Sequence, residues 1–291
     1  MVAVAPNYES FSKGNWRFAV LSGSWNQELQ DLILGLAERQ PSSKHPQTLQ
    51  FRYPESKQGS LFYLKIFHWA GGLAAIKDLF RYSKAFRSLC QTVALSRAGF
   101  DVPTTIAAGE FRRFGILSRA FVVTPEIRGQ SAPLFLLNCH ALGPPVLPLA
   151  KKRDSLMRLA ETIRRLHRMG FVHGDLVPSN IFISETDGGS LRFYLMDNDR
   201  TRRYPCWFPQ ALWKRNLVQL NRFPLPGISL QDRMRFFRRY LGRDELRVAD
   251  RRLLRWLEMK TRERRQECDH VDATLEFRKL MRWAENKATK V

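Results

Sequence analysis

Short and largely apolar stretches, separated by polar turns, recur in the first half of the chain. Stretches of this length that are bounded by turn residues predict β-strands. The predicted strands are residues 16–21, 48–53, 60–67, 105–111 and 120–124. Two helices interrupt them: residues 25–37 carry leucine and isoleucine at helical spacing, and residues 78–98 end at Gly99. A mainly β region is therefore predicted to come first.

A helical pattern replaces these strand-like stretches after a proline-rich connection at residues 143–148. Residues 154–169 predict an amphipathic helix that ends at Gly170. Two short strands follow, at residues 181–183 and 191–195, and the remaining chain is predicted to be helical. One further helix is predicted to bury Leu230, Met234, Phe237 and Leu241 and to turn Arg235, Arg238, Arg239 and Arg243 outward.

Composition and charge narrow the class of protein. With 291 residues, of which 44% are hydrophobic, the chain can bury a large core and is not predicted to be disordered. Its net charge is +21, and residues 201–291 contribute +12 of it through 23 basic and 11 acidic residues. Such a surface attracts nucleic acid, anionic lipid or a phosphorylated substrate, or is simply a solvated helical face. We expect no nucleic-acid partner, because no zinc-finger or RNA-recognition motif is present.

Other classes of protein are not expected either. The most apolar window, residues 133–150, contains four prolines, so we expect no transmembrane helix. The first eleven residues lack the pattern of a secretory signal. The cysteines are Cys90, Cys139, Cys206 and Cys268. Their scatter predicts a reducing, cytoplasmic environment without a disulfide framework, and the pair Cys268 and His270 lacks the further ligands of a zinc site.

One loop carries the most informative polar residues. It follows the helix at residues 154–169 and presents Asp175 and then Asn180. Asn180 stands just before the first strand of a predicted hairpin, and Asp197 stands just after the second. Antiparallel pairing would bring those two strand ends side by side. An amide oxygen and a carboxylate that converge in this way suit Mg²⁺, while Asp175 could accept a proton from a hydroxyl.

A lysine in an apolar strand is the second candidate. Lys65 lies in the middle of the strand predicted at residues 60–67, where it is costly unless it meets a carboxylate or a phosphate. Together with the loop residues it matches the phosphoryl-transfer template of the protein-kinase-like fold. In that template Lys65 contacts the phosphates of ATP, and Asp175 is the catalytic residue that orients the acceptor hydroxyl. Asn180 and Asp197 hold Mg²⁺ and, through it, the nucleotide.

Longer motifs point to one family within this fold. Residues 173–182 (HGDLVPSNIF) and 194–200 (YLMDNDR) are the central ones, and residues 97–103, 216–222 and 235–241 add to them. These segments resemble the lipopolysaccharide kinase family, bacterial enzymes that phosphorylate Kdo or heptose in the inner core of lipopolysaccharide. The resemblance runs from about Trp16 to Leu241.

This resemblance implies an α+β, two-lobed protein-kinase-like fold. A mainly β N-terminal lobe would comprise residues 1–126 and a helical C-terminal lobe residues 127–291, with ATP and Mg²⁺ between them. The implied acceptor is a sugar hydroxyl of a lipid-linked core oligosaccharide. The basic C-terminal region would then bind the anionic sugar, or hold a cytoplasmic enzyme peripherally on the anionic surface of the inner membrane.

Two departures from the kinase pattern leave other functions open. In our register Ala85 occupies the helix position where a glutamate would pair with Lys65, and no glycine-rich loop precedes Lys65. Both departures favour a pseudokinase that binds without transferring phosphate. A third reading keeps the chemistry but gives it a different small-molecule or protein acceptor.

Overall fold

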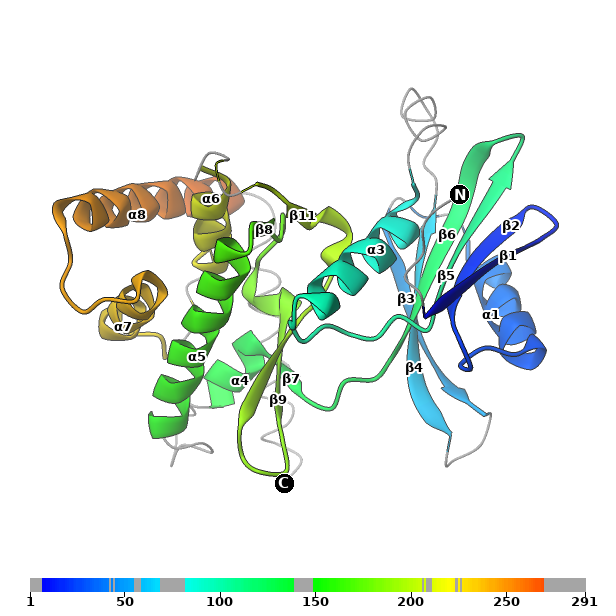
Figure 1. Ribbon diagram of the computed structural model, residues 1–291, viewed down its shortest axis with the longest axis horizontal. Coiled ribbons are helices and arrows are strands. Elements are labelled where there is room, and N and C mark those ends of the chain that lie inside the picture. The colour runs from blue at the N-terminus through cyan, green and yellow to red at the C-terminus, as the bar shows by residue number, and fades with distance from the viewer. Residues whose placement is uncertain are drawn as a thin grey trace. The chain divides into compact units, whose positions relative to one another are not determined.

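The computed structural model describes residues 7–41, 43, 45–54, 59–68, 82–138, 149–205, 207, 211–222, 225 and 227–269 (Figure 1). It divides into two compact units. The first comprises Met1–Arg128 with Tyr194–Thr201, and the second comprises Gly129–Phe193 with Arg202–Val291. Several predicted features lie outside the described residues: Cys139, Cys206, His270, the connection at residues 143–148 and the start of the helix predicted from residue 78.

A six-stranded antiparallel sheet forms the frame of the first unit. Its strands are β1 (Tyr8–Lys13), β2 (Trp16–Leu21), β3 (Gln47–Tyr53), β4 (Ser60–His68), β5 (Ala107–Arg113) and β6 (Ile116–Pro125). They lie in the order β1-β2-β5-β6-β4-β3. The five strands predicted in this half of the chain are all confirmed. The edge strand β1 was not predicted, because neither of its faces is buried and its sequence lacks a run of apolar residues.

One helix packs on each face of this sheet. Helix α1 (Gln27–Arg39) buries Leu29 and Ile33 against the face that carries Ile66, while α3 (Lys84–Arg97) packs on the face that carries Phe67. The two faces differ because neighbouring residues of a strand point in opposite directions. Lys65 pairs with Val122 across β4 and β6, and Val122 belongs to the apolar cluster under α3. Lys65 is therefore on the α3 face of the sheet.

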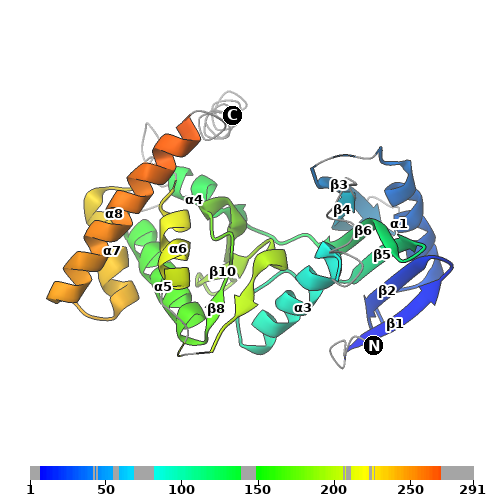
Figure 2. The same cartoon turned by 90° about the horizontal axis from the view of Figure 1, so that it is seen from above.

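Helices dominate the second unit. They are α4 (Ala132–Asn138), α5 (Leu149–Arg168), α6 (Ala211–Leu220), α7 (Leu230–Leu241) and α8 (Val248–Asp269). Helix α5 packs against α7, and α8 packs against α6 along one side of the unit (Figure 2). The short strands β7 (Gln130–Ser131), β9 (Ile181–Glu185) and β10 (Leu191–Leu195) form one small sheet, and β8 (Phe171–Val172) pairs with β11 (Arg202–Arg203). The predicted hairpin is thus present as β9 and β10.

The predicted core face of α7 is wrong at its first residue. Leu230 is 76% exposed, whereas the side chain of Asp232 is buried and accepts a hydrogen bond from Lys152 Nζ at 2.8 Å. Ser229 and Asp232 also form a capping box at the start of the helix. The cap and the buried ion pair therefore decide which side of the first turn faces inward. Phe237 is buried as predicted.

Among the residues that the structure describes, no helix combines the length and the apolar character that crossing a bilayer requires.

Together these elements confirm the predicted α+β class. A mainly β region in the first half of the chain is followed by a mainly helical region in the second half.

Candidate functional site

The loop that carries Asp175 lies in the second unit, between β8 and a single 3₁₀ turn at Pro178–Asn180 (η1). Asn180 closes the loop by donating from Nδ2 to the backbone carbonyl of Asp175 at 3.0 Å. The backbone N–H of Val177 donates to the same carbonyl at 2.9 Å. Because the amide nitrogen of Asn180 is engaged in this way, its Oδ1 is the atom that could coordinate a cation. The predicted approach of Asn180 to Asp197 stays a prediction.

Helix α6 holds the same loop by side chains. Asn216 Oδ1 accepts from the backbone N–H of His173 at 3.0 Å, and Gln219 Oε1 accepts from that of Leu176 at 3.2 Å. Gln219 Nε2 donates to the carbonyl oxygen of Gly174 at 2.9 Å. Backbone groups on both sides of Asp175 are thus bonded to one helix.

A buried histidine supports Asn216 from the end of α5. His167 contacts Asn216 Oδ1 through Nε2 at 3.3 Å and the hydroxyl of Tyr240 through Nδ1 at 2.8 Å. An amide oxygen can only accept, so Nε2 carries a proton, and in the neutral imidazole Nδ1 then accepts from Tyr240. Burial lowers the pKa of His167 to about 4, although the hydrogen bond with Asn216 opposes the shift. His167 is therefore a packed structural histidine at neutral pH.

The second pair of predicted residues meets in the first unit. Lys65 Nζ lies 2.6 Å from Asp197 Oδ1, and both side chains are about one-third exposed. The carboxylate that Lys65 was predicted to need is thus Asp197. Asp197 follows β10 and has φ 55° and ψ 55°, a left-handed conformation that residues other than glycine adopt rarely. Such strain clusters at functional sites, where the surrounding structure enforces it.

Neighbouring polar contacts fix the backbone around Asp197. Leu195 donates its backbone N–H to the carbonyl of Asp101 at 3.0 Å. Asn198 is 1% exposed, and its Nδ2 donates to the carbonyl of Leu195 at 2.9 Å and to the hydroxyl of Thr92 on α3 at 3.4 Å. The loop that carries Asp197 is therefore attached to α3.

A second acidic residue, Asp199, stands close to the first. Burial raises the pKa of Asp199 and the charge of Asp197 raises it further, while Lys65, Arg200 and Lys84 oppose the shift.

Ala85, the position where we expected a glutamate, is fully buried on α3. It packs in the apolar cluster with Phe67 and Val122, on the face of the sheet that also carries Lys65. Within the described residues, the ion-pair partner of Lys65 is Asp197 and not a residue of α3.

Asp197 and Asn180, which lie in different units, each carry an oxygen that could bind Mg²⁺. Among the described residues, no group of three or more histidine, cysteine, aspartate or glutamate side chains gathers as a metal site. Mg²⁺ in phosphoryl-transfer sites needs fewer protein ligands, because phosphate oxygens and water complete its shell. The carboxylate of Asp197 and the Oδ1 of Asn180 are hard oxygen donors of the kind it prefers.

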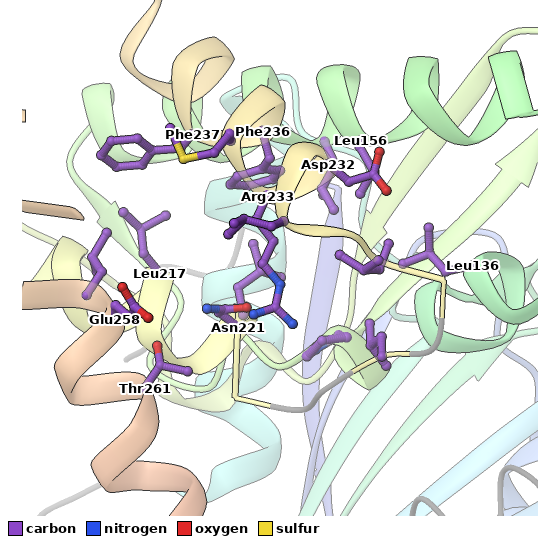
Figure 3. Close-up of a pocket in the computed structure, with 18 of the residues that line it drawn as sticks. Leu136, Leu156, Leu217, Asn221, Asp232, Arg233, Phe236, Phe237, Glu258 and Thr261 are labelled. Carbon is purple, nitrogen blue, oxygen red and sulfur yellow. The ribbon is translucent and has the colours of Figure 1, made fainter. Parts of the chain in front are cut away.

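An apolar cavity of about 220 Å³ lies among the helices of the second unit (Figure 3). Leu136, Leu156, Leu217 and Phe237 line it, and Asp232 and Thr261 are among its few polar residues. Pro178, next to the loop of Asp175, also lines the cavity. Asp175 itself does not, so this cavity is not where a hydroxyl would meet Asp175.

A family comparison bears on what these residues do. A model of the "Lipopolysaccharide kinase (Kdo/WaaP) family" matches residues 72–240, which is more than half of the chain. The chain belongs to the lipopolysaccharide kinase (Kdo/WaaP) family. The matched residues include Asp175, Asn180 and Asp197, whereas Lys65 precedes them.

Individual relatives agree with this family. The chain is 29% identical over 164 residues to a 3-deoxy-D-manno-octulosonic acid kinase of Haemophilus influenzae (strain ATCC 51907 / DSM 11121 / KW20 / Rd). That match covers 53% of this chain, and the chain spans 62% of the length of the relative. A solved structure of WaaP in complex with acyl carrier protein is 20% identical, with a TM-score of 0.58, and the match covers 82% of this chain and 97% of that one. The predicted protein-kinase-like fold is thereby confirmed for this lipopolysaccharide kinase family member.

Three amide side chains at the site escaped the sequence reasoning: Asn198, Asn216 and Gln219. Asn216 and Gln219 lie within the segment 216–222 that resembles the family, but no role was assigned to either. The available signal was an Asn and a Gln three positions apart, on one face of an otherwise largely apolar helix. Asn198 lies between Asp197 and Asp199, and only these two acidic residues were considered as metal ligands.

Proposed function

We propose that this protein is an ATP-dependent kinase that phosphorylates a sugar hydroxyl, of Kdo or heptose, in the inner core of lipopolysaccharide. The observation that carries the proposal is the ion pair between Lys65 and a strained, left-handed Asp197. It occurs in a chain of the Kdo/WaaP family. A pseudokinase that had lost its chemistry would have no need to maintain that strain.

Each residue has a distinct role in this proposal. Lys65 binds the phosphates of ATP. Its carboxylate partner, Asp197, keeps the ammonium group in place for this contact. Asp175 accepts a hydrogen bond from the acceptor hydroxyl and directs its oxygen at the γ-phosphate. Because the transferred group needs little covalent help, this positioning and the charge of Lys65 account for most of the catalysis.

Asn180 and Asp197 are the proposed ligands of Mg²⁺. Bound there, the ion would neutralise charge on the phosphate oxygens of the nucleotide. Asp197 contributes a carboxylate that is already held in one geometry by its own backbone and by Lys65. Asn180 contributes a neutral oxygen whose direction is set by the hydrogen bond from its Nδ2.

Phosphate transfer to a defined acceptor tests this function. Purified protein would be incubated with Mg²⁺, radiolabelled ATP and deep-rough lipopolysaccharide that lacks core phosphates. We expect label in the acceptor, and we expect Asp175→Ala to abolish it. Asp187→Ala is the matched control, since Asp187 is an exposed aspartate in the β9–β10 turn of the same unit.

The two possible failures have different meanings. If the wild-type protein binds Mg·ATP but labels no acceptor, the pseudokinase or a kinase with another acceptor replaces this proposal. If Asp175→Ala transfers phosphate at the wild-type rate, the role of Asp175 is wrong even though the activity stands.

We further propose that the protein is cytoplasmic and docks peripherally on the anionic inner membrane, where a lipid-linked acceptor would be found. Three exposed arginines on α8, Arg251, Arg252 and Arg255, have no ion-pair partner among the described residues. On the same helix Val248 is 66% exposed and Met259 is 49% exposed. Basic side chains beside exposed apolar ones suit a surface of anionic headgroups over hydrocarbon.

Vesicle sedimentation tests this docking. Replacing the three α8 arginines by alanine should weaken binding to vesicles that contain phosphatidylglycerol, by about tenfold or more at low salt. The control is the triple alanine variant of the exposed residues Arg39, Arg97 and Arg113, which removes the same charge from the other unit. Equal losses in the two variants would indicate that net charge, and not α8, determines binding.

A further inference from the structure

The amide groups of α6 form a closed set of hydrogen bonds with the loop around Asp175. Gln219 Oε1 accepts from Leu176 N–H at 3.2 Å and from Asn216 Nδ2 at 2.9 Å, while its Nε2 donates to the Gly174 carbonyl at 2.9 Å. Asn216 Oδ1 accepts from His173 N–H at 3.0 Å. Every oxygen in the set accepts and every nitrogen donates, so both amide orientations are consistent with each other.

The amide of Gln219 can make these bonds because it carries both a donor and an acceptor. A carboxylate at position 219 could accept from Leu176 but could not donate to Gly174, and an apolar side chain could do neither. Asn216 is 1% exposed, so water is not available there to replace a lost bond. The set depends on having an amide at both positions of α6.

The bonds act on the backbone on both sides of Asp175 but not on Asp175 itself. They engage His173 and Gly174 before it and Leu176 after it. The carboxylate remains available for a substrate while the peptide units that aim it are held. This is the arrangement that a reaction controlled by positioning requires.

We propose that Asn216 and Gln219 are positioning residues, which fix the direction of Asp175 by clamping its loop to α6. The inference rests on the proposed function of Asp175 in phosphate transfer. It assigns a share of the turnover rate to two residues that act through the backbone of the loop.

Kinetics of two variants test the clamp. Gln219→Met removes all the bonds of this amide, and Gln219→Glu removes the donation to Gly174 while retaining an acceptor for Leu176. We expect each to lower kcat by roughly 10- to 100-fold, since a displacement near 1 Å costs about that much. KM for ATP should change less than kcat, because Lys65 and Asp197 lie in the other unit and, of the proposed nucleotide contacts, only Asn180 belongs to the clamped loop.

Hydrogen exchange supplies a readout that needs no substrate. The Leu176 amide should exchange faster in Gln219→Met than in the wild type and should stay protected in Gln219→Glu, which keeps its acceptor. Gln266→Glu is the matched control: it makes the same amide-to-carboxylate change at an exposed position of α8 and should alter neither kcat nor exchange at Leu176.

The outcomes separate this inference from the proposed function. Unchanged kcat in both Gln219 variants, or a loss explained entirely by a smaller folded fraction, would overturn the clamp. So would unchanged exchange at Leu176 in Gln219→Met. If the wild-type protein transfers no phosphate, the proposed function fails, yet the exchange experiment still decides whether the clamp holds the loop.

Discussion

Lys65 and Asp197 form an ion pair with 2.6 Å between Nζ and Oδ1, although 132 positions separate them in the chain. The pair joins a central strand of the sheet to the loop after β10, and both residues belong to the first unit. Lys65 thus has an acidic partner even though Ala85 on α3 cannot supply one. The positive charge of Lys65 is therefore balanced, although Ala85 stands where a glutamate was expected.

Replacing Lys65 should impair use of ATP. Lys65→Met keeps the length and apolar stem of the side chain but removes the charge that would meet the phosphates. We expect kcat/KM for ATP to fall by about 10²-fold, in line with the loss of one preorganised electrostatic contact. Steady-state kinetics at saturating acceptor measure it. Lys13→Met is the control, since Lys13 forms an exposed ion pair with Asp31 in the same unit. An equal effect of the two substitutions would contradict the role of Lys65.

Two substitutions at Asp197 separate charge from backbone strain. Asparagine tolerates a positive φ, so Asp197→Asn should change the free energy of unfolding by less than about 1 kcal/mol, because the ion pair that it removes is partly exposed. Alanine tolerates that φ poorly, so Asp197→Ala should cost roughly 1 kcal/mol more. Both should weaken the binding of Mg·ATP at least tenfold in a calorimetric titration. Undiminished affinity in Asp197→Asn would exclude its carboxylate as a metal ligand.

Much of the fold follows from local patterns. The strands β2 to β6 are short apolar stretches between turns, and the helix at the end of which His167 lies has a continuous apolar stripe. The predicted core face of α7 was wrong at its first residue. Periodicity identified the helix, but Leu230 is exposed because Asp232 is drawn inward by Lys152, 80 positions away. A sequence pattern cannot display an ion pair between residues so distant.

The candidate site also contains residues that the sequence identified and residues that it did not. Residue type and order along the chain were enough to nominate Lys65, Asp175, Asn180 and Asp197 as candidates. The side chains that support the two loops were not found, because their partners are remote: Asn216 lies 43 positions from His173, and Asn198 lies 106 positions from Thr92. A buried amide is recognised as structural only when its hydrogen bonds are seen.

The bond between Asn198 and Thr92 gives a third prediction. Thr92→Val removes the hydroxyl that accepts one of the two amide hydrogens of Asn198 and leaves the shape nearly unchanged. We expect the free energy of unfolding to fall by about 0.5–1.5 kcal/mol, measured by urea denaturation. Thr162→Val should have a smaller effect, because the Thr162 hydroxyl donates only within its own helix, to Arg158 at 2.9 Å.

A double-mutant cycle sharpens this third test. If Thr92 and Asn198 act through one bond, the losses in Thr92→Val and Asn198→Ala should not add in the double variant. Strict additivity would mean that the 3.4 Å contact between them contributes no free energy. Faster hydrogen exchange at residues 197–201 in Thr92→Val would locate the effect in the loop of Asp197.

The buried His167 predicts how stability depends on pH. Its pKa is lowered to about 4 in the folded protein from 6.5, so the unfolded chain binds the proton more tightly. The contribution to stability is complete above pH 6.5 and is lost as the pH falls toward 4. Between pH 7 and pH 5 the linkage amounts to about 2 kcal/mol.

Denaturation of matched histidine variants at the two pH values measures this contribution. His167→Gln replaces the imidazole by an amide, which does not take up a proton. Between pH 7 and pH 5 the free energy of unfolding of this variant should therefore fall by about 2 kcal/mol less than that of the wild type. His45→Gln, at an exposed position of the other unit, should keep the wild-type dependence. If the two variants lose stability in parallel on acidification, protonation of His167 is not what destabilises the fold.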